Sequence, residues 1–527
     1  MPDLSGYDLV LASTESALNS SIAYANFWKV TINCQLNPDV PVDKSPGLVD
    51  AKIAAPTLRL SGHDLASNQA AVTLQFTAGA LQYLDVIHYV TVSQDIAGWA
   101  ITFAANIGQG AIPGSAEIDQ LPAEVQNALS NERLSVGQLF LELSTVVWAN
   151  VTITDADGNR VTDAVATQTL ETALQSWARS IESAAQQWVL NYVVTSSNGA
   201  GNASADLLTD LVPTSYNFSV SKYDPPGTYD DLSTLNYLMM TEGRSAPTAN
   251  SAGIFDFNWV AGPNTQQYQG AVAIDGPLFD RAYVEPLLLP AIAAAVSATK
   301  PTSTGLTVST SSPGVPTFTR TGPAQWSTSQ SVDLYGNQNG GKGQKLEGLG
   351  LLQAVYQNII EKLDCTVTLD PASATYHVKV TYTAVTTITV EFVGWDKTDS
   401  SFSGNYVLPW SFDVRLKASS NGSLVTESTE VQEGESSSDT WGNSFVGDIW
   451  AGISEVFSLF LNTYQKQFQD KAASVSQSAF ANVSDELEAA MGDISAAIVF
   501  PAGNRFAYKD VRFDSDQSLV AYVTYIN

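Results

Sequence analysis

The chain has few cysteines, histidines and basic residues for its length of 527 residues. Its two cysteines, Cys34 and Cys365, cannot build a disulfide framework or a thiolate zinc site. Its three histidines, His63, His88 and His377, are spread over both halves, so a three-histidine metal site would have to join distant segments. We therefore expect neither a metal nor a cofactor.

Basic residues are outnumbered, with 24 Lys and Arg against 53 Asp and Glu, and the formal net charge is −29. Binding to nucleic acid depends on Lys and Arg that displace counterions from phosphates, so a nucleic-acid partner is excluded. The same charge opposes electrostatic docking to anionic lipid. Any contact with lipid would have to be apolar.

No apolar run is long enough to span a membrane. The most apolar segment, Val284–Val296, is interrupted by Glu285, Pro286 and Pro290 and is shorter than the roughly 20 residues that a span requires. We expect no transmembrane segment. The first residues, Met1–Leu9, show no secretory signal, so we expect a cytoplasmic protein, one exported by a non-classical route, or a mature form.

Two long amphipathic helices are predicted, at about Leu170–Tyr192 and Phe445–Phe468, because apolar residues recur at spacings of three and four. Both exceed the usual length of about 11 to 12 residues. Their apolar stripes consist of Leu170, Leu174, Trp177, Ile181, Ala185, Trp188 and Tyr192, and of Phe445, Ile449, Ile453, Phe457, Phe460, Tyr464 and Phe468.

Strands are predicted on either side of each long helix, so the chain reads as α+β with two domains, 1–275 and 276–527. A Ser-, Thr- and Pro-rich stretch at about 300–325 is a linker or a surface excursion. The other predicted elements are helices at Ser13–Trp28, Phe279–Thr299 (kinked by prolines) and Lys345–Leu363, and strands at Ser215–Ser221, Ile254–Val260, Tyr376–Tyr382, Thr386–Phe392, Arg505–Val511 and Leu519–Ile526.

No catalytic motif is complete. The glycine-rich segment Gly336–Gly343 follows a predicted strand, but Gly343 stands where a phosphate-binding loop needs Ser or Thr after Lys342. The segment Asp155–Gly158 suits a hairpin turn better than a calcium loop. A pair of carboxylates for glycoside hydrolysis is defined by distance in space, so the sequence leaves that alternative open.

The aromatic stripes of the two helices are either filled core or the lining of a groove. Small residues among large ones would leave unfilled volume, and an unfilled apolar seam is a site for an apolar molecule. The predicted groove residues are Trp177, Ile181, Trp188, Phe457, Phe460 and Tyr464.

The chain opens with Gly6–Val10 (GYDLV) before a helix that contains Asn19, and it closes with Phe500–Phe513 (FPAGNRFAYKDVRF). These ends resemble those of TULIP-type (tubular lipid-binding) proteins, in particular the ones encoded beside clostridial neurotoxin genes. The resemblance implies two tubular domains, each a highly curved antiparallel sheet wrapped around a long amphipathic helix. It carries no catalytic residues.

We therefore expect a protein that is not an enzyme and that binds a lipid or another hydrophobic small molecule. The resemblance also implies a toxin-associated or secreted accessory role, with protein partners in a toxin or surface assembly. Two alternatives remain: a β-rich carbohydrate-binding or adhesion protein that stacks sugars on exposed aromatics, and a glycan-active hydrolase.

Overall fold

The computed structural model shows an α+β fold in which antiparallel strands dominate. The first of two compact units comprises Met1–Phe279, Ala418–Ser423 and Ala489–Asn527, and the second comprises Asp280–Lys417 and Leu424–Glu488. The residues that the structure describes are 4–24, 28–60, 65–66, 68–85, 88–112, 121–131, 134–183, 188–196, 211–222, 233–247, 255, 259–260, 268–299, 315–333, 344–346, 352–392, 400–442, 462, 466–467, 470–471, 480–500 and 505–526.

A six-stranded antiparallel sheet in the first unit includes strands from near both ends of the chain. In order across the sheet, the strands are β11 (Ser215–Ser221), β12 (Thr234–Met240), β1 (Leu9–Thr14), β13 (Gly270–Ile274), β25 (Leu519–Ile526) and β24 (Arg505–Phe513). Every residue of β1, β12 and β13 is buried, so the centre of this sheet is covered on both faces. The sequence-based division places β24 and β25 in the second domain, whereas the structure groups them with the first unit.

The second sheet of the first unit has ten strands. Its strands are β2 (Thr31–Gln35), β3 (Gly47–Ile53), β5 (Gln69–Asp85), β7 (Ala100–Ala111), β8 (Leu134–Glu142), β10 (Trp188–Ser196) and β23 (Ile498–Val499), with β4 (Thr57–Arg59), β6 (Val90–Asp95) and β9 (Thr152–Thr154) paired beside them. The strand β9 leads into the predicted turn, where Asp155 Oδ1 accepts the N–H of Asn159 at 2.8 Å.

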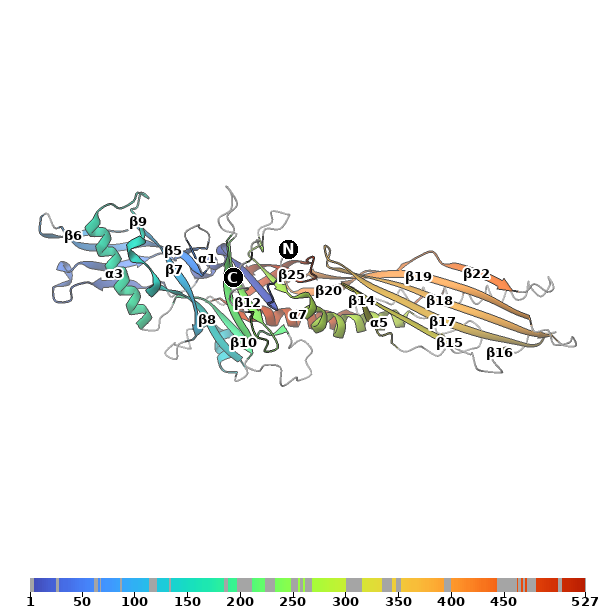
Figure 1. The fold of residues 1–527 in the computed structure, drawn as a ribbon. Coiled ribbons are helices and arrows are strands. Elements are labelled where there is room, and N and C mark those ends of the chain that lie inside the picture. The colour runs from blue at the N-terminus through green and yellow to red at the C-terminus, as the bar shows by residue number, and fades with distance from the viewer. Residues whose placement is uncertain are drawn as a thin grey trace. The chain divides into compact units, whose positions relative to one another are not determined.

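The helix α3 (Ala164–Ser183) lies against β2, β3 and β5 of the ten-stranded sheet (Figure 1). It begins where the Asp163 carboxylate accepts the backbone N–H groups of Val165 and Ala166, at 2.9 and 3.1 Å. Leu170 and Leu174, one turn apart, are fully buried. The predicted amphipathic helix is therefore confirmed from Leu170 to Ser183, although it begins six residues earlier than predicted, and its apolar face covers the sheet.

Short helices complete the first unit. The predicted helix after β1 is confirmed, and Thr14 caps it by accepting the N–H of Ala17 at 3.2 Å. These helices are α1 (Glu15–Tyr24), α2 (Ala123–Leu129) and α4 (Gly276–Phe279), with 3-10 turns η1 (Val42–Lys44), η3 (Leu143–Thr145) and η4 (Trp148–Asn150).

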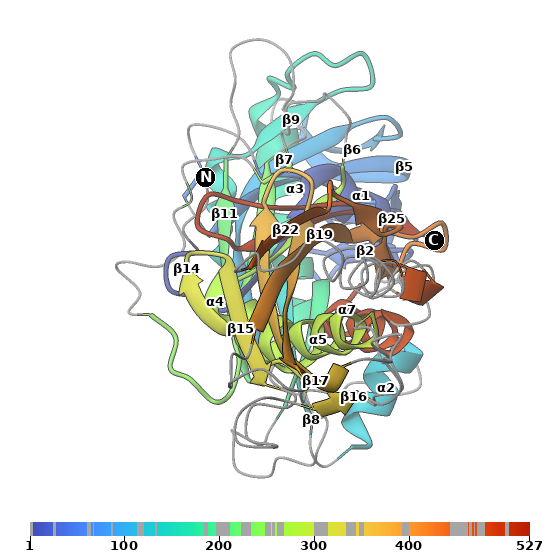
Figure 2. The same ribbon diagram turned by 90° about the vertical axis from the view of Figure 1, so that its right-hand side faces the viewer.

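The second unit is built on one antiparallel sheet with three very long central strands, which Figure 2 shows nearly end-on as a curved half-barrel. Its strands, in order, are β14 (Thr319–Gly322), β15 (Gln325–Asp333), β17 (Leu352–Asp370), β18 (Thr375–Phe392), β19 (Ser400–Ala418) and β20 (Leu424–Ser428), with β16 (Gln344–Leu346), β21 (Gln432–Glu433) and β22 (Ser437–Gly442) paired beside them.

The predicted kinked helix is confirmed as a π-helix, η7 (Asp280–Leu288), that continues into α5 (Leu289–Ala298). Pro286 lies inside the π-helix and has no N–H to donate, which is a local reason for the widened turn. Figure 2 shows α5 on the inner side of the curved sheet. A further helix, α7 (Ala481–Ala496), precedes β23.

One helix among the described residues, Gly276–Ala298, has the length and apolar composition needed to cross a membrane. Half of its most apolar stretch is nevertheless buried inside the protein. Tyr283, for example, is fully buried and its hydroxyl is hydrogen-bonded to Thr426 Oγ1 at 2.8 Å.

The first long helix was predicted to continue to Tyr192, and this part of the prediction is wrong. The helix ends at Ser183, and Trp188 and Tyr192 lie on β10, which pairs with β8. Trp188 and Tyr192 continue the helical spacing, but the segment from 188 to 194 is rich in valine and aromatic residues, which favour a strand. The second long helix, 445–468, falls almost entirely outside the described residues.

The helix predicted at Lys345–Leu363 is also wrong, because the chain forms β16 and the first part of β17 there. Alternate side chains of β17 are buried, including Ile359, Leu363 and Val367, which is the period of a strand. The two strands predicted between Tyr376 and Phe392 are one strand, β18. The strands predicted at 215–221, 505–511 and 519–526 are confirmed.

Candidate functional site

A cavity of about 400 Å³ lies in the second unit, between the η7–α5 helix and the first strands of the curved sheet. Glu285 comes from η7, Leu289 and Pro290 from α5, Arg320 from β14 and Trp326 from β15. The remaining lining residues belong to the segment that leads into β14 and are Val315, Pro316, Thr317 and Phe318.

The floor of the cavity is fixed by the sheet. Trp326 is only 1% exposed, and it stands in register with Val367 on β17. Val367 is paired in register with Val378 on β18, and Val378 is paired with Phe412 on β19. Four buried apolar side chains therefore form one row across the sheet. This row includes the indole of Trp326, which lines the cavity together with Leu289 of α5.

The mouth of the cavity is formed by exposed residues. Val315 is 61% exposed, and Glu285, Pro290 and Thr317 are also exposed. Leu289 and Pro316, in contrast, are buried. The site therefore runs from solvent into an apolar interior.

Charge at the cavity is distributed unevenly. Arg320 Nη2 lies 2.9 Å from Asp280 Oδ2, and the Asp280 side chain is only 9% exposed. The Arg320 guanidinium also lies 5.6 Å from the ring centroid of Trp326, within cation–π range. Glu285 forms no ion pair within the described part of the chain. Because Asp280 compensates Arg320, Glu285 is the one lining charge that has no ion-pair partner among the described residues.

A buried polar layer lies behind Trp326. The ring of Tyr376 is 6.3 Å from that of Trp326, and burial, with a smaller contribution from the Asp280 carboxylate, raises the pKa of the Tyr376 hydroxyl well above its usual value. Burial likewise raises the pKa of Tyr283, against a smaller opposite effect of its hydrogen bond to Thr426. These hydroxyls stay neutral at physiological pH, so they offer no base to a ligand.

Three of the six predicted groove residues, Trp177, Ile181 and Trp188, belong to the first unit. Trp177 lies on α3 and Trp188 on β10, and their rings meet edge to face with centroids 5.7 Å apart. Trp188 is 3% and Ile181 9% exposed, whereas Trp177 is half-buried. The structure thus brings two predicted residues together, from a helix and a strand. The other three predicted residues, Phe457, Phe460 and Tyr464, lie outside the described residues.

Two residues of the sequence mark the position of the cavity. Glu285 and Pro290 interrupt the most apolar run of the chain, and both line the cavity. A charged residue and a proline in such a run mark the place where an apolar helix meets solvent. Nothing in the sequence linked them to Phe318 or Trp326, because that contact depends on the fold.

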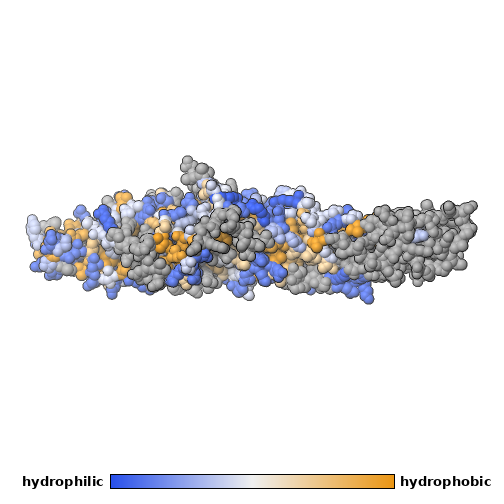
Figure 3. Space-filling view, turned by 90° about the horizontal axis from the view of Figure 1, so that it is seen from below, coloured by the Kyte–Doolittle hydropathy of each residue, from blue (hydrophilic) through white to orange (hydrophobic). Residues whose placement is uncertain are grey.

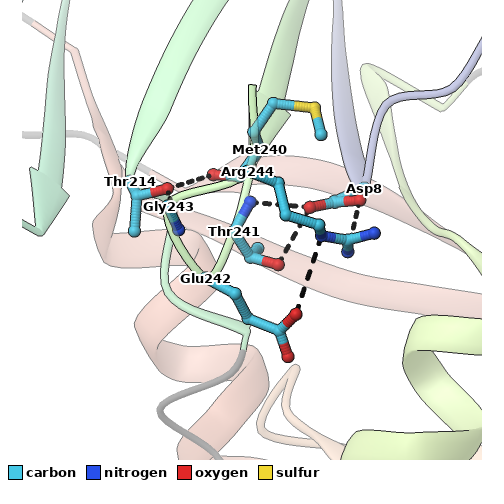
Figure 4. Close-up of polar contacts among 7 residues, drawn as sticks. All are labelled: Asp8, Thr214, Met240, Thr241, Glu242, Gly243 and Arg244. Atoms are coloured by element: carbon cyan, nitrogen blue, oxygen red, sulfur yellow. Dashed lines mark hydrogen bonds and ion pairs between the residues drawn. The ribbon is translucent and has the colours of Figure 1, made fainter. Parts of the chain in front are cut away.

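A second polar cluster lies in the first unit, at the start of β1 (Figure 4). Asp8 accepts the backbone N–H and the hydroxyl of Thr241 at 2.7 and 3.0 Å, and it pairs with Arg244 at 2.5 Å. Arg244 also lies 3.6 Å from Glu242. Because both oxygens of the Asp8 carboxylate are engaged, this cluster ties β1 to the turn after β12 and is not a free acid.

The histidines form separate pairs. His88 Nδ1 lies 2.6 Å from Asp85 in the first unit, and His377 Nδ1 lies 2.7 Å from Asp413 across β18 and β19 in the second. His63 and the glycine-rich segment Gly336–Gly343 lie outside the described residues. Within the part of the chain that the structure describes, no three His, Cys, Asp or Glu side chains are placed to hold a metal ion.

No protein-family description matches this chain, and no curated protein matches its sequence. A solved crystal structure of a lipopolysaccharide binding protein is similar over 99% of both chains, at 9% sequence identity and a TM-score of 0.28. A TM-score this low is no argument for a shared function. The function of this chain is therefore argued from its own residues.

Proposed function

We propose that this protein binds a lipid or another hydrophobic small molecule in the cavity of the second unit, without catalysing a reaction. The observation that carries the proposal is the lining of the cavity. Six of its nine residues are apolar, namely Leu289, Pro290, Val315, Pro316, Phe318 and Trp326. The volume of about 400 Å³ falls within the range of small-molecule sites, which are typically apolar with a few polar groups.

Burial of an alkyl chain supplies enough free energy without a charged anchor. Each methylene that leaves water contributes about 0.8 kcal/mol, so eight of them contribute about 6 kcal/mol before the entropic cost of association is subtracted. The net charge of −29 does not oppose such binding, because the contribution is not electrostatic. Among ligands with the same head group, selectivity would then come from the length and shape of the alkyl chain.

We also propose that both units have the tubular architecture that the resemblance to TULIP-type proteins implies. The curved sheet of the second unit with α5 on its inner side supports this proposal, as does α3 lying along the ten-stranded sheet of the first unit. A role beside a toxin rests on the resemblance of the chain's ends alone.

The tryptophans give the carbohydrate-binding alternative little support, although one tyrosine of the described residues, Tyr89, is 84% exposed. Stacking on sugars requires exposed aromatic faces. Of the eight tryptophans whose side chains the structure describes, six are buried and two, Trp28 and Trp177, are half-buried. On the face drawn in Figure 3, the coloured residues are mostly hydrophilic, with small apolar areas between them.

The first experiment is extraction of the purified protein with organic solvent, followed by mass spectrometry. We expect a lipid or another apolar molecule in the extract at a substantial fraction of the protein concentration. An empty extract would be compatible with loss during purification, so it is followed by titration of the protein with a neutral fluorescent probe such as N-phenyl-1-naphthylamine. Absence of saturable probe binding would reject the proposal.

A matched pair of variants locates the site. Val315→Glu places a charge at the mouth of the cavity, and Val147→Glu places one at an equally exposed valine of the first unit, 62% exposed against 61%. We expect Val315→Glu to weaken probe binding about tenfold, equivalent to about 1.4 kcal/mol, and Val147→Glu to leave it unchanged. Equal affinities for the two variants would place the ligand elsewhere.

A further inference from the structure

We infer that the cavity of the second unit selects amphiphiles by the charge of their head group, and that it takes cationic or neutral ones in preference to anionic ones. This inference rests on the proposed function and adds the chemical class of the ligand. It depends on three charged residues at the cavity, Asp280, Glu285 and Arg320.

Arg320 does not serve as an anchor for an anionic head group. Its guanidinium is held by the Asp280 carboxylate at 2.9 Å, and it lies over the ring of Trp326. An anionic head group would have to compete with a carboxylate whose side chain is only 9% exposed. Removing Asp280 from that pair would leave its charge uncompensated in a poorly solvated position, which is costly.

Glu285 is available to a cationic head group. It lines the cavity and is exposed, and within the described residues no cation pairs with it. An alkyl chain that lies against Leu289 and Phe318 would leave its head group at the rim, where Glu285 is. A cation there gains an attraction, and an anion meets a repulsion.

The size of the preference follows from the exposure of Glu285. An exposed ion pair changes affinity by up to about fivefold, and a like-charged pair changes it by a similar factor in the opposite direction. We therefore expect an alkylammonium to bind about tenfold more tightly than a carboxylate with the same chain at low salt. The ratio should shrink as the ionic strength rises, because exposed charges are screened.

The test is displacement of N-phenyl-1-naphthylamine from the full-length protein by three twelve-carbon amphiphiles below their micelle concentrations: dodecyltrimethylammonium, dodecanol and dodecanoate. We expect affinity to fall in that order. Glu285→Gln should bring the three affinities within about twofold of one another. Glu435→Gln removes the same charge from an exposed residue of the second unit that does not line the cavity, and it should preserve the order.

The outcomes separate the two proposals. Failure of all three amphiphiles to displace the probe would reject the cavity as a hydrophobic binding site. Displacement with equal affinities in the unmodified protein would keep the proposed function and overturn the charge preference. Tightest binding of dodecanoate, abolished by Arg320→Gln, would also overturn it and would assign the head group to Arg320.

Discussion

The guanidinium of Arg320 lies 2.9 Å from the Asp280 carboxylate and joins β14 to the first turn of η7. This pair lies at the cavity, because Arg320 is one of its lining residues. It determines two properties of the second unit: how firmly the helix is held on the sheet, and how much positive charge the cavity presents.

Asp280→Asn should destabilise the second unit by about 1 to 2 kcal/mol. The Asp280 side chain is 9% exposed, but Arg320 is 40% exposed, so the loss is smaller than for a fully buried pair. Urea denaturation measures the change. The control is Asp364→Asn, which breaks a 2.8 Å pair with Lys362 whose side chains are 39% and 49% exposed, and it should cost under about 0.5 kcal/mol. Equal losses of unfolding free energy in Asp280→Asn and Asp364→Asn would mean that the Arg320–Asp280 pair stabilises the protein no more than an exposed ion pair.

Asp8→Asn should destabilise the first unit more strongly, by about 2 to 3 kcal/mol, because a carboxylate that is 3% exposed loses its charge-assisted bonds to Thr241 and Arg244. Glu242→Gln is the control, since Glu242 lies 3.6 Å from Arg244 and both side chains are partly exposed. We expect a change below about 0.5 kcal/mol for that variant in the same denaturation experiment. A larger effect of Glu242→Gln than of Asp8→Asn would contradict this account of the cluster.

The sequence predicted correctly those helices and strands in which the residue spacing and the conformational preferences of the residues favour the same structure. The strand at 215–221 falls in this group, because polar and apolar residues alternate along it, and so does the part of α3 from Leu170 to Ser183, where apolar residues keep helical spacing. The start of α3 at Ala164 was not predicted, although the cap at Asp163 marks it. The prediction failed at Trp188, where a side chain continues the helical spacing by coincidence. It failed again at Ile359, because pairing with β15 and β18 decides the conformation of β17.

The cavity was not predictable in the same way. Leu289 and Trp326 are far apart in sequence and meet because α5 lies on the inner side of a curved sheet. The curvature and register of the sheet are long-range properties, which hydrophobic spacing within a segment does not encode. The sequence predicted an apolar ligand beside a helix and a sheet, and of the predicted residues that the structure describes, Trp177, Ile181 and Trp188, none lines this cavity.

Cys365 should be inert to thiol reagents in the folded protein. Burial raises its pKa to about 12, so its thiolate is scarce at pH 8. Cys34 is only half-buried and should react first with Ellman's reagent. We expect one fast thiol in native protein and two in urea, and Cys34→Ser should remove the fast one. Rapid reaction of Cys365 in the native state would contradict its burial.

The same raised pKa has a consequence for stability. Below the ordinary thiol pKa of about 8.5, Cys365 is neutral in both the folded and the unfolded chain, so its favourable contribution is fully present. As pH rises toward about 12, the unfolded chain ionises first, and the stability contributed by Cys365 is lost. The difference in unfolding free energy between Cys365→Ala and the unmodified protein should therefore shrink from pH 8 to pH 10, measured with urea. A difference that grows with pH would reverse the sign of the argument.

Variants of Trp177 and Trp188, whose rings are in contact, test whether the first unit also has a site for an apolar ligand. Trp188→Ala should cost about 3 to 5 kcal/mol, as for a buried tryptophan, and Trp177→Ala, which removes a half-buried ring, should cost less. If the space around the two rings is filled by protein side chains, a double-mutant cycle of Trp177 and Trp188 should give a coupling free energy of about 0.5 to 1.5 kcal/mol. Trp177→Ala should then leave probe binding unchanged. If that space holds ligand, Trp177→Ala should weaken probe binding while Val315→Glu does not. The paired result therefore assigns the ligand to one unit or the other.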